Sequence, residues 1–171
     1  MVLDSPGTKV ENRPTSTPAR DANSLTGMSP SRPIVLLVED SEDDAYFFRH
    51  TVKKSGLDCA LFHVADGGAA LDYLKAALAS PHDATRPWPD LIFLDLKLPT
   101  FSGFEILEWL RAQKIGRELD VAVLSGSEHD SDVSRALALG ASAYYVKPVS
   151  VDQLRARFSR HVETQSARGA A

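Results

Sequence analysis

Residues 90–103 read DLIFLDLKLPTFSG and place one carboxylate, Asp95, directly after an uninterrupted apolar run. Such a run is typical of a strand that is covered on both faces, as in a parallel sheet. Asp95 would then lie at the carboxyl end of that strand, the edge at which open α/β sheets bind ligands. Pro99 and Gly103 indicate a loop there, and residues 103–113 resume with helical apolar spacing. Asp95 is therefore a candidate site residue, although an aspartate at a strand end can also be a simple cap or turn residue.

The composition bounds the fold and excludes several classes of function. A chain of 171 residues can form one well-buried domain with tails, and its net charge of −4 gives no signal for binding nucleic acid. Cys59 is the only cysteine, which excludes an internal disulfide and a thiolate metal cluster. The sequence lacks a signal-peptide pattern and any apolar run near the about 18 residues of a membrane span. We expect a cytoplasmic protein with neither a nucleic-acid nor a membrane partner.

The chain around this stretch alternates between short apolar runs and segments with helical spacing. Strands are predicted at 34–38, 59–64, 91–94, 119–124 and 141–146, and a helix follows each of them. This alternation predicts an α/β fold with a doubly wound, five-stranded parallel sheet. Residues 1–32 are rich in Pro, Ser and Thr and are predicted to form a disordered tail. The domain is predicted to span 33–162, with a C-terminal tail at 163–171.

The apolar spacing also predicts which helix residues face the core. In the first helix, Phe47, Phe48 and Val52 are expected to point inward. Leu78 in the second helix and Val162 in the last are likewise assigned to buried faces.

The first predicted strand ends in the acidic run Glu39-Asp40-Ser41-Glu42-Asp43-Asp44. Ser41 is a good helix cap, and residues 42–44 would stabilise the start of the helix through its dipole. This explanation does not cover Glu39 and Asp40, which precede the cap. Two adjacent like charges at a partly buried edge are unfavourable unless a cation joins them.

Three later strands end in Asp95, Ser125 and Lys147. In a sheet of order 2-1-3-4-5 the first and third strands are neighbours, so the carboxylates meet at the topological switch point. Carboxylates gathered there suit Mg²⁺, which prefers oxygen ligands, and a nearby lysine and hydroxyl suit a phosphoryl group. We therefore predict that Asp95 attacks a phosphoryl donor to form an aspartyl phosphate, with Lys147 and Ser125 binding phosphoryl oxygens.

Four segments together resemble the motif blocks of the response-regulator receiver domain of two-component signalling. They are VLLVEDS (35–41), DLIFLDLKLP followed by SGF (90–104), VAVLSGS (121–127) and GASAYYVKP (140–148). The resemblance spans about 33–162 and implies the flavodoxin-like receiver fold. It also implies that the Mg²⁺ ligands are the carboxylates of Glu39, Asp40 and Asp95 and the main-chain carbonyl of Lys97.

The resemblance further assigns the switching residues. Asp95 is implied to be the phosphoacceptor, Ser125 the switch hydroxyl, Tyr144 the switch aromatic and Lys147 the family's phosphoryl-binding lysine. Phosphorylation is expected to draw Ser125 toward the new oxygens and to free space that Tyr144 can enter.

A signalling role rather than an enzymatic one follows from this resemblance. The protein would accept a phosphoryl group from a histidine kinase and catalyse only its own phosphorylation and dephosphorylation. The sequence after Val162 is too short for an output domain, so it resembles single-domain regulators that dock to a partner or pass the phosphate on to a phosphotransfer domain. The ED pair, the loop at 80–89 and LDLKLP look most like stand-alone receivers partnered with bacterial phytochromes and related hybrid kinases. Several of these form homodimers through the fourth helix, fifth strand and fifth helix, and we expect the same here.

Three alternatives remain. A phosphatase of the haloacid dehalogenase type would need an acid two residues after Asp95, where Lys97 stands. An FMN-binding flavodoxin module would need a hydroxyl-rich loop after the first strand, where this chain is acidic. A degenerate receiver would bind partners without being phosphorylated.

Overall fold

The computed structural model describes residues 32–80, 83–113, 119–126 and 128–169. The tail predicted at 1–32 therefore lies outside the described residues, apart from Arg32. The elements in chain order are β1 (Ile34–Val38), α1 (Glu42–Ser55), β2 (Ala60–Val64), α2 (Gly67–Ala79), β3 (Leu91–Asp95), α3 (Gly103–Ala112), β4 (Asp120–Ser125), α4 (Asp130–Ala138), β5 (Ala143–Val146) and α5 (Val151–Gly169).

The five strands form one parallel sheet in the order β2-β1-β3-β4-β5, which confirms the predicted topology. The central strand is β3, and all five of its residues are buried. Because the chain runs from β1 outward to β2 and then back across to β3, the ends of β1 and β3 lie side by side at the switch point.

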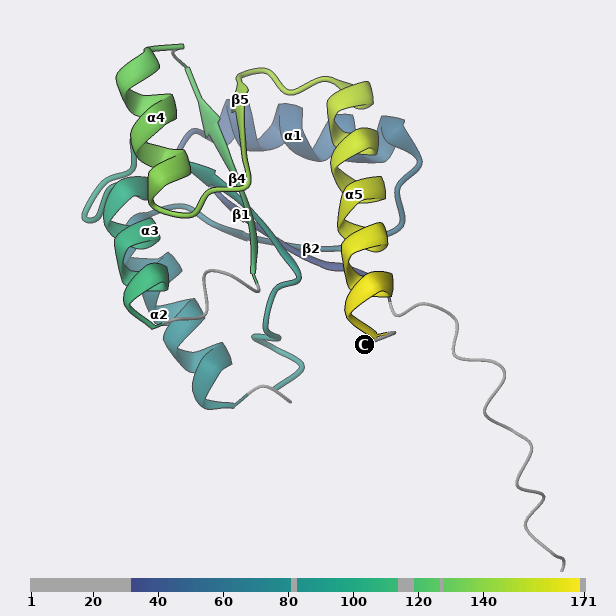
Figure 1. Cartoon of the computed structure of the whole chain (residues 1–171), viewed down its shortest axis with the longest axis horizontal. Coiled ribbons are helices and arrows are strands. Elements are labelled where there is room, and N and C mark those ends of the chain that lie inside the picture. Colours follow the sequence, from purple (N-terminus) through teal and green to yellow (C-terminus); the bar gives the residue numbers. More distant parts are fainter. Residues whose placement is uncertain (1–31, 81–82, 114–118, 127, 170–171) are drawn as a thin grey trace, which may run out of the picture. The chain divides into compact units, whose positions relative to one another are not determined.

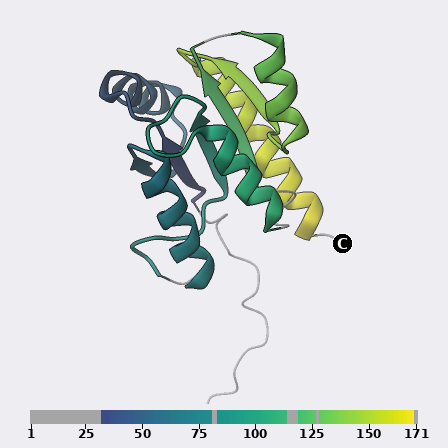
Figure 2. The same cartoon turned by 90° about the vertical axis from the view of Figure 1, so that its left-hand side faces the viewer.

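Helices cover both faces of the sheet (Figure 1). Along β1, Val35 and Leu37 belong to the core that α1 and α5 cover, whereas Leu36 and Val38 belong to the core under α2, α3 and α4. This alternation explains why the strand sequence is apolar throughout: successive side chains point to opposite faces, and both faces are buried. Figure 2 shows the layer of α2, α3 and α4 from its outer side.

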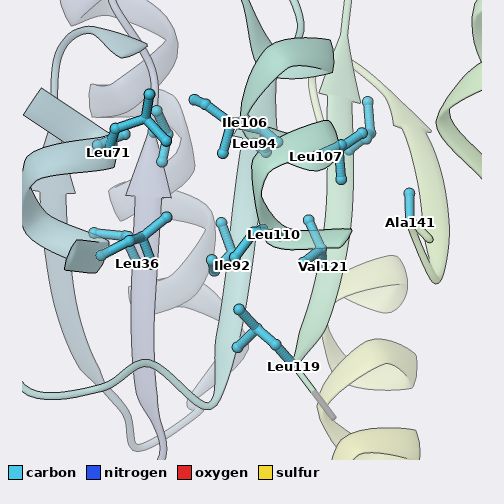
Figure 3. Packing of buried hydrophobic residues seen from close by; sticks show 14 of the residues in the cluster. Leu36, Leu71, Ile92, Leu94, Ile106, Leu107, Leu110, Leu119, Val121 and Ala141 are labelled. Atoms are coloured by element: carbon cyan, nitrogen blue, oxygen red, sulfur yellow. The ribbon is translucent and has the colours of Figure 1, made fainter. Parts of the chain in front are cut away.

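The larger core lies between the sheet and α2, α3 and α4. Leu36 and Ile92 from the sheet meet Leu71 from α2 and Leu110 from α3 there (Figure 3). On the opposite face, Phe48 of α1 packs on Phe93 of β3 with 4.8 Å between their ring centroids. The two cores hold the sheet rigidly, so its carboxyl edge is a fixed platform.

Local capping explains where the helices begin and end. Ser41 caps α1, and Gly56 ends it in the left-handed conformation with φ 72°. Ser102 and Glu105 form a capping box at the start of α3. Helix α5 continues to Gly169, beyond the end predicted at Val162.

Three of the predicted inward-facing residues are exposed instead: Phe47 is 57% exposed, Leu78 41% and Val162 52%. Each is adjacent in the sequence to a residue on the buried stripe of its helix, and consecutive helix residues point about 100° apart. In α1 the buried position is taken by Phe48, and in α5 it is taken by His161.

A partly buried polar cluster joins α5 to the amino end of β4. Asp120 forms an ion pair with Arg157, and its Oδ2 lies 3.5 Å from Nδ1 of His161. Ser142 donates a hydrogen bond to Asp120 and accepts one from Arg157. Since Arg157 and His161 are almost fully buried, this cluster fixes α5 at the end of the sheet away from Asp95. Within the described ranges, every helix is too short or too polar to span a lipid bilayer.

The neighbouring phenylalanines of α1 provide a matched test of the packing. We expect Phe48→Ala to lower the free energy of unfolding by about 3 to 5 kcal/mol, because it removes a buried ring that packs on Phe93. Phe47→Ala should change it by less than about 0.5 kcal/mol, because that ring is largely in solvent. Urea denaturation of the two variants measures both values, and equal losses would contradict the assignment of faces.

Candidate functional site

The acids predicted from the sequence meet at the carboxyl edge of the sheet. The pairing of Val38 with Leu94 places Glu39, which follows β1, beside Asp95, the last residue of β3. One carboxylate oxygen from each of Glu39, Asp40 and Asp95 lies within 4.8 Å of the others. Glu39 and Asp95 are buried and Asp40 is exposed. The structure thus brings together three groups that lie up to 56 residues apart in the chain.

Hydrogen bonds hold both the backbone and the side chain of Glu39 in place. Its N–H donates to the carbonyl of Val64 in β2 at 3.1 Å. Its Oε1 accepts from the N–H of Ser41 at 3.2 Å. The side chain that results is only 1% exposed, which makes Glu39 one of the most deeply buried groups of the described chain.

The loop after β3 is equally constrained around Asp95. Oδ1 of Asp95 accepts from the N–H of Lys97 at 3.1 Å. A Cβ atom at Gly103 would come within 2.2 Å of the Asp95 carbonyl oxygen, so only glycine allows α3 to start this close to the strand end. Thr100 adopts a φ of 67°, an unusual backbone angle for a β-branched residue, and completes the tight turn.

Lys147 is the cation that joins the acids. Its Nζ lies 2.6 Å from Oε2 of Glu39, 2.7 Å from Oδ2 of Asp95 and 3.1 Å from Oδ2 of Asp44. Burial alone would lower the pKa of Lys147, but its hydrogen bonds to Asp95 and Glu39 outweigh burial and raise the pKa. Lys147 is therefore protonated at neutral pH and neutralises part of the acidic cluster.

The ionisation of Glu39 reflects two opposing effects. Burial raises the pKa of its carboxyl group, and the hydrogen bond from Lys147 lowers the pKa. The net pKa lies above its ordinary value. The charge of Glu39 therefore depends on the nearby ammonium group of Lys147.

Asp44 was not predicted as a site residue, because its position in the first turn of α1 is explained by the helix dipole. The available signal was geometric: helix side chains lean toward the amino terminus of the helix, which here points to the strand edge. His63 was not predicted as a site residue either, yet its Nε2 lies 2.8 Å from the Glu39 carbonyl oxygen.

Ser125 lies at the end of β4, the strand next to Asp95, and Tyr144 lies one strand further out, on β5. Ser125 ends β4, is 1% exposed, and accepts the backbone N–H of Lys147 through its carbonyl at 2.8 Å. Tyr144 of β5 is half-buried against the core under α2, α3 and α4, whereas Tyr145 packs on the opposite face. The positions of both agree with the sheet topology that was predicted, and their switching roles stay predictions.

The acid cluster fits a divalent cation in the chemistry of its donors. All three groups are carboxylates, the ligand type that Mg²⁺ and Mn²⁺ prefer. Ligand oxygens on opposite sides of Mg²⁺ are about 4.2 Å apart, and the three oxygens here lie within 4.8 Å of one another. Glu39, Asp40 and Asp95 would hold such an ion, and the Lys97 carbonyl remains a predicted further ligand.

Comparison with known proteins identifies relatives of this chain. A family model described as the response regulator receiver domain matches residues 35–159. The response regulator Rcp1 of Synechocystis sp. is 31% identical over 121 residues, which cover 71% of this chain and 80% of Rcp1. The polar-differentiation response regulator DivK of Brucella ovis is 33% identical over 117 residues, which cover 68% of this chain and 85% of DivK.

Solved structures give a consistent picture. The bacteriophytochrome response regulator AtBRR has a TM-score of 0.65 at 32% identity, covering 76% of this chain and 92% of its own. The phosphorylated cyanobacterial phytochrome response regulator RcpA has a TM-score of 0.60 at 30% identity, covering 72% and 86%. The Mn²⁺-bound form of Rcp1 has a TM-score of 0.60 at 31% identity, covering 73% and 88%.

Removing the ammonium group tests the electrostatics of the cluster. We expect Lys147→Met to lower the free energy of unfolding by about 1 to 3 kcal/mol at neutral pH, because Glu39 then stays buried without its cation. The pKa of Glu39 should rise further, and a carboxyl whose pKa is raised by folding binds its proton more tightly in the native state. The native variant therefore gains stability as the pH falls toward that pKa.

The deficit of Lys147→Met relative to wild type should accordingly shrink between about pH 7.5 and about pH 5.5. Urea denaturation across this range measures the deficit, and Lys75→Met, which removes an exposed lysine of α2, is the control. A deficit that stays constant or widens on acidification would contradict the assigned role of Lys147.

Proposed function

The chain belongs to the response regulator receiver family of two-component signalling proteins, and we propose that it accepts a phosphoryl group on Asp95 from a histidine kinase in a Mg²⁺-dependent reaction in the cytoplasm. The observation that carries this proposal is the position of Lys147, whose Nζ contacts both Asp95 and Glu39. One ammonium group then lies beside the proposed nucleophile and beside the proposed metal ligands.

The proposed reaction transfers the phosphoryl group from a histidine nitrogen of the kinase to an oxygen of Asp95. The P–N bond breaks, a P–O bond forms, and the histidine nitrogen keeps the electron pair of the broken bond. The Lys97 N–H holds Oδ1 of Asp95, and Lys147 lies at Oδ2, so the carboxylate is oriented before the donor arrives. A bound Mg²⁺ ion would neutralise negative charge on the carboxylates and on the transferred group.

Lys147 and Ser125 are proposed to bind the new phosphoryl oxygens. Lys147 would exchange its contact with the Asp95 carboxylate for a charge-assisted bond to phosphate. Ser125 ends the neighbouring strand, and its hydroxyl would donate to a second oxygen. Movement of Ser125 would leave room for Tyr144, and the repacked surface would dock a partner or support phosphorelay.

The relatives support a particular class of kinase partner. AtBRR is a bacteriophytochrome response regulator, and RcpA is a phytochrome response regulator. We therefore propose that a bacteriophytochrome or a related hybrid histidine kinase phosphorylates this protein. Support for Mg²⁺ comes from the three carboxylates of the site and from the Mn²⁺-bound form of Rcp1.

Phosphorylation by a small donor tests this function directly. We expect the protein to gain the mass of one phosphoryl group when it is incubated with acetyl phosphate and Mg²⁺, because Asp95 is positioned as a nucleophile. Intact-mass spectrometry measures the gain. Asp95→Asn should gain none, and Asp66→Asn, which changes the cap of α2, is the control and should react as wild type does.

Unmodified wild-type protein after this incubation would refute phosphorylation and favour the degenerate receiver that binds partners without it. A gain of mass in Asp95→Asn would show that another residue accepts the phosphate.

We further propose a homodimer through the face formed by α4, β5 and α5. Strand β5 is an edge of the sheet, and the helices beside it expose Leu137, which is 48% exposed, and Val162. Apolar side chains beside a sheet edge are typical of protein contacts.

Sedimentation velocity tests the dimer. We expect Leu137→Glu to shift the protein toward the monomer, because the charge would lie inside the proposed interface. Leu78→Glu, at a similarly exposed leucine of α2, should leave the sedimentation coefficient of wild type unchanged. A monomeric wild type, or equal effects of both variants, would refute this interface.

A further inference from the structure

His63 contacts the backbone between the two acids that follow β1. It is the fourth residue of β2, the edge strand beside β1, and its side chain lies at the same end of the sheet as Asp95. Its Nε2 is 2.8 Å from the carbonyl oxygen of Glu39. Its Nδ1 is 3.3 Å from Nη1 of Arg49 in α1.

These two contacts define the form of the imidazole ring. A carbonyl oxygen can only accept a hydrogen bond, so Nε2 of His63 must carry the proton. A guanidinium group can only donate, so Nδ1 must present its lone pair to Arg49. Nη2 of Arg49 is in turn 3.7 Å from Oε2 of Glu42, which lies about two helical turns earlier in α1. A chain of contacts therefore runs from Glu42 through Arg49 and His63 to the Glu39 carbonyl.

The Glu39 carbonyl belongs to the peptide group that joins Glu39 to Asp40. Rotation of this peptide plane would move the Asp40 carboxylate relative to the Glu39 carboxylate. The N–H of Glu39 is held by Val64, the last residue of β2. The backbone pairing of β2 ends at Val64. The side chain of His63 then makes the next hydrogen bond to the neighbouring backbone, at the carbonyl of Glu39.

From this geometry we propose that His63 is a positioning residue of the divalent-cation site. It fixes the peptide plane between Glu39 and Asp40 and so sets the separation of their carboxylates before an ion binds. Groups that orient metal ligands in this way commonly change metal affinity about 10- to 100-fold when they are removed. The inference rests on the proposed function, since the ion it serves is the Mg²⁺ of phosphorylation.

The decisive experiment measures ion binding without any reaction. Electron paramagnetic resonance of free Mn²⁺, titrated with protein, gives the dissociation constant for Mn²⁺. Competition by Mg²⁺ then gives the dissociation constant for Mg²⁺. We expect His63→Phe and His63→Leu to weaken Mn²⁺ and Mg²⁺ binding about tenfold, because neither side chain can donate to the Glu39 carbonyl. His63→Gln keeps an N–H donor and should restore most of the affinity.

Two further variants separate this role from general stability. Arg49→Met leaves the Nε2 donor in place but removes the partner that orients the ring, so its loss of affinity should be smaller than that of His63→Phe. His50→Phe changes an exposed histidine of α1 that stacks on Tyr46, and it should bind Mn²⁺ as wild type does. Thermal unfolding shows which variants are folded. One folded variant, either His63→Phe or His63→Leu, is enough for the binding test.

Phosphorylation by acetyl phosphate gives a second readout. Folded His63→Phe should need about tenfold more Mg²⁺ for half-maximal rate, with the rate at saturating Mg²⁺ close to that of wild type. Unchanged Mn²⁺ and Mg²⁺ dissociation constants in His63→Phe and His63→Leu would overturn the inference, as would an equal loss in His63→Gln. A wild type that binds neither ion would instead refute the proposed metal-dependent function, so the two failures are distinguishable.

Discussion

The contacts of one ammonium group hold the functional end of this protein together. Lys147 follows β5, yet its Nζ reaches Glu39 after β1, Asp95 at the end of β3 and Asp44 in α1. A buried carboxylate such as Glu39 is strongly unfavourable without a partner, and Lys147 supplies the nearest compensating charge. The position of each acid thus depends on the strand order, which brings β1 next to β3, and on a lysine that arrives from the sheet edge.

In this arrangement the same carboxylates can bind either Lys147 or a divalent ion. A divalent ion bound by Glu39, Asp40 and Asp95 would take over charge that Lys147 now balances, which would leave the lysine available for an incoming phosphoryl group. Asp44 lies outside the trio of candidate ion ligands, and it can keep the ammonium at the site while the other contacts change. The proposed chemistry of the site would therefore consist mainly of an exchange of ionic partners among side chains that stay in place.

The sequence predicted the sheet well because each strand is a short apolar run and the polar residues stand at the run ends. The same argument placed Asp95, Glu39 and Lys147 at one edge. It failed where two apolar residues are adjacent, as with Phe47 and Phe48, since spacing alone does not say which one faces the sheet. It also missed His63 and His161, because their roles depend on which backbone or side chain the fold brings next to them. The last turns of α5 were missed because they lack an apolar stripe.

The buried ion pair between Arg157 and Asp120 gives the five helices unequal freedom. Tilting α5 would separate the buried guanidinium of Arg157 from its carboxylate, which is costly. Helix α4 has no comparable buried anchor among the described residues: Ala136 is its only buried side chain, and Arg135 contacts Glu108 and Phe104 of α3 at the surface. If the sheet edge rearranges as proposed, α4 would move more readily than α5, and α5 would keep its place against the sheet.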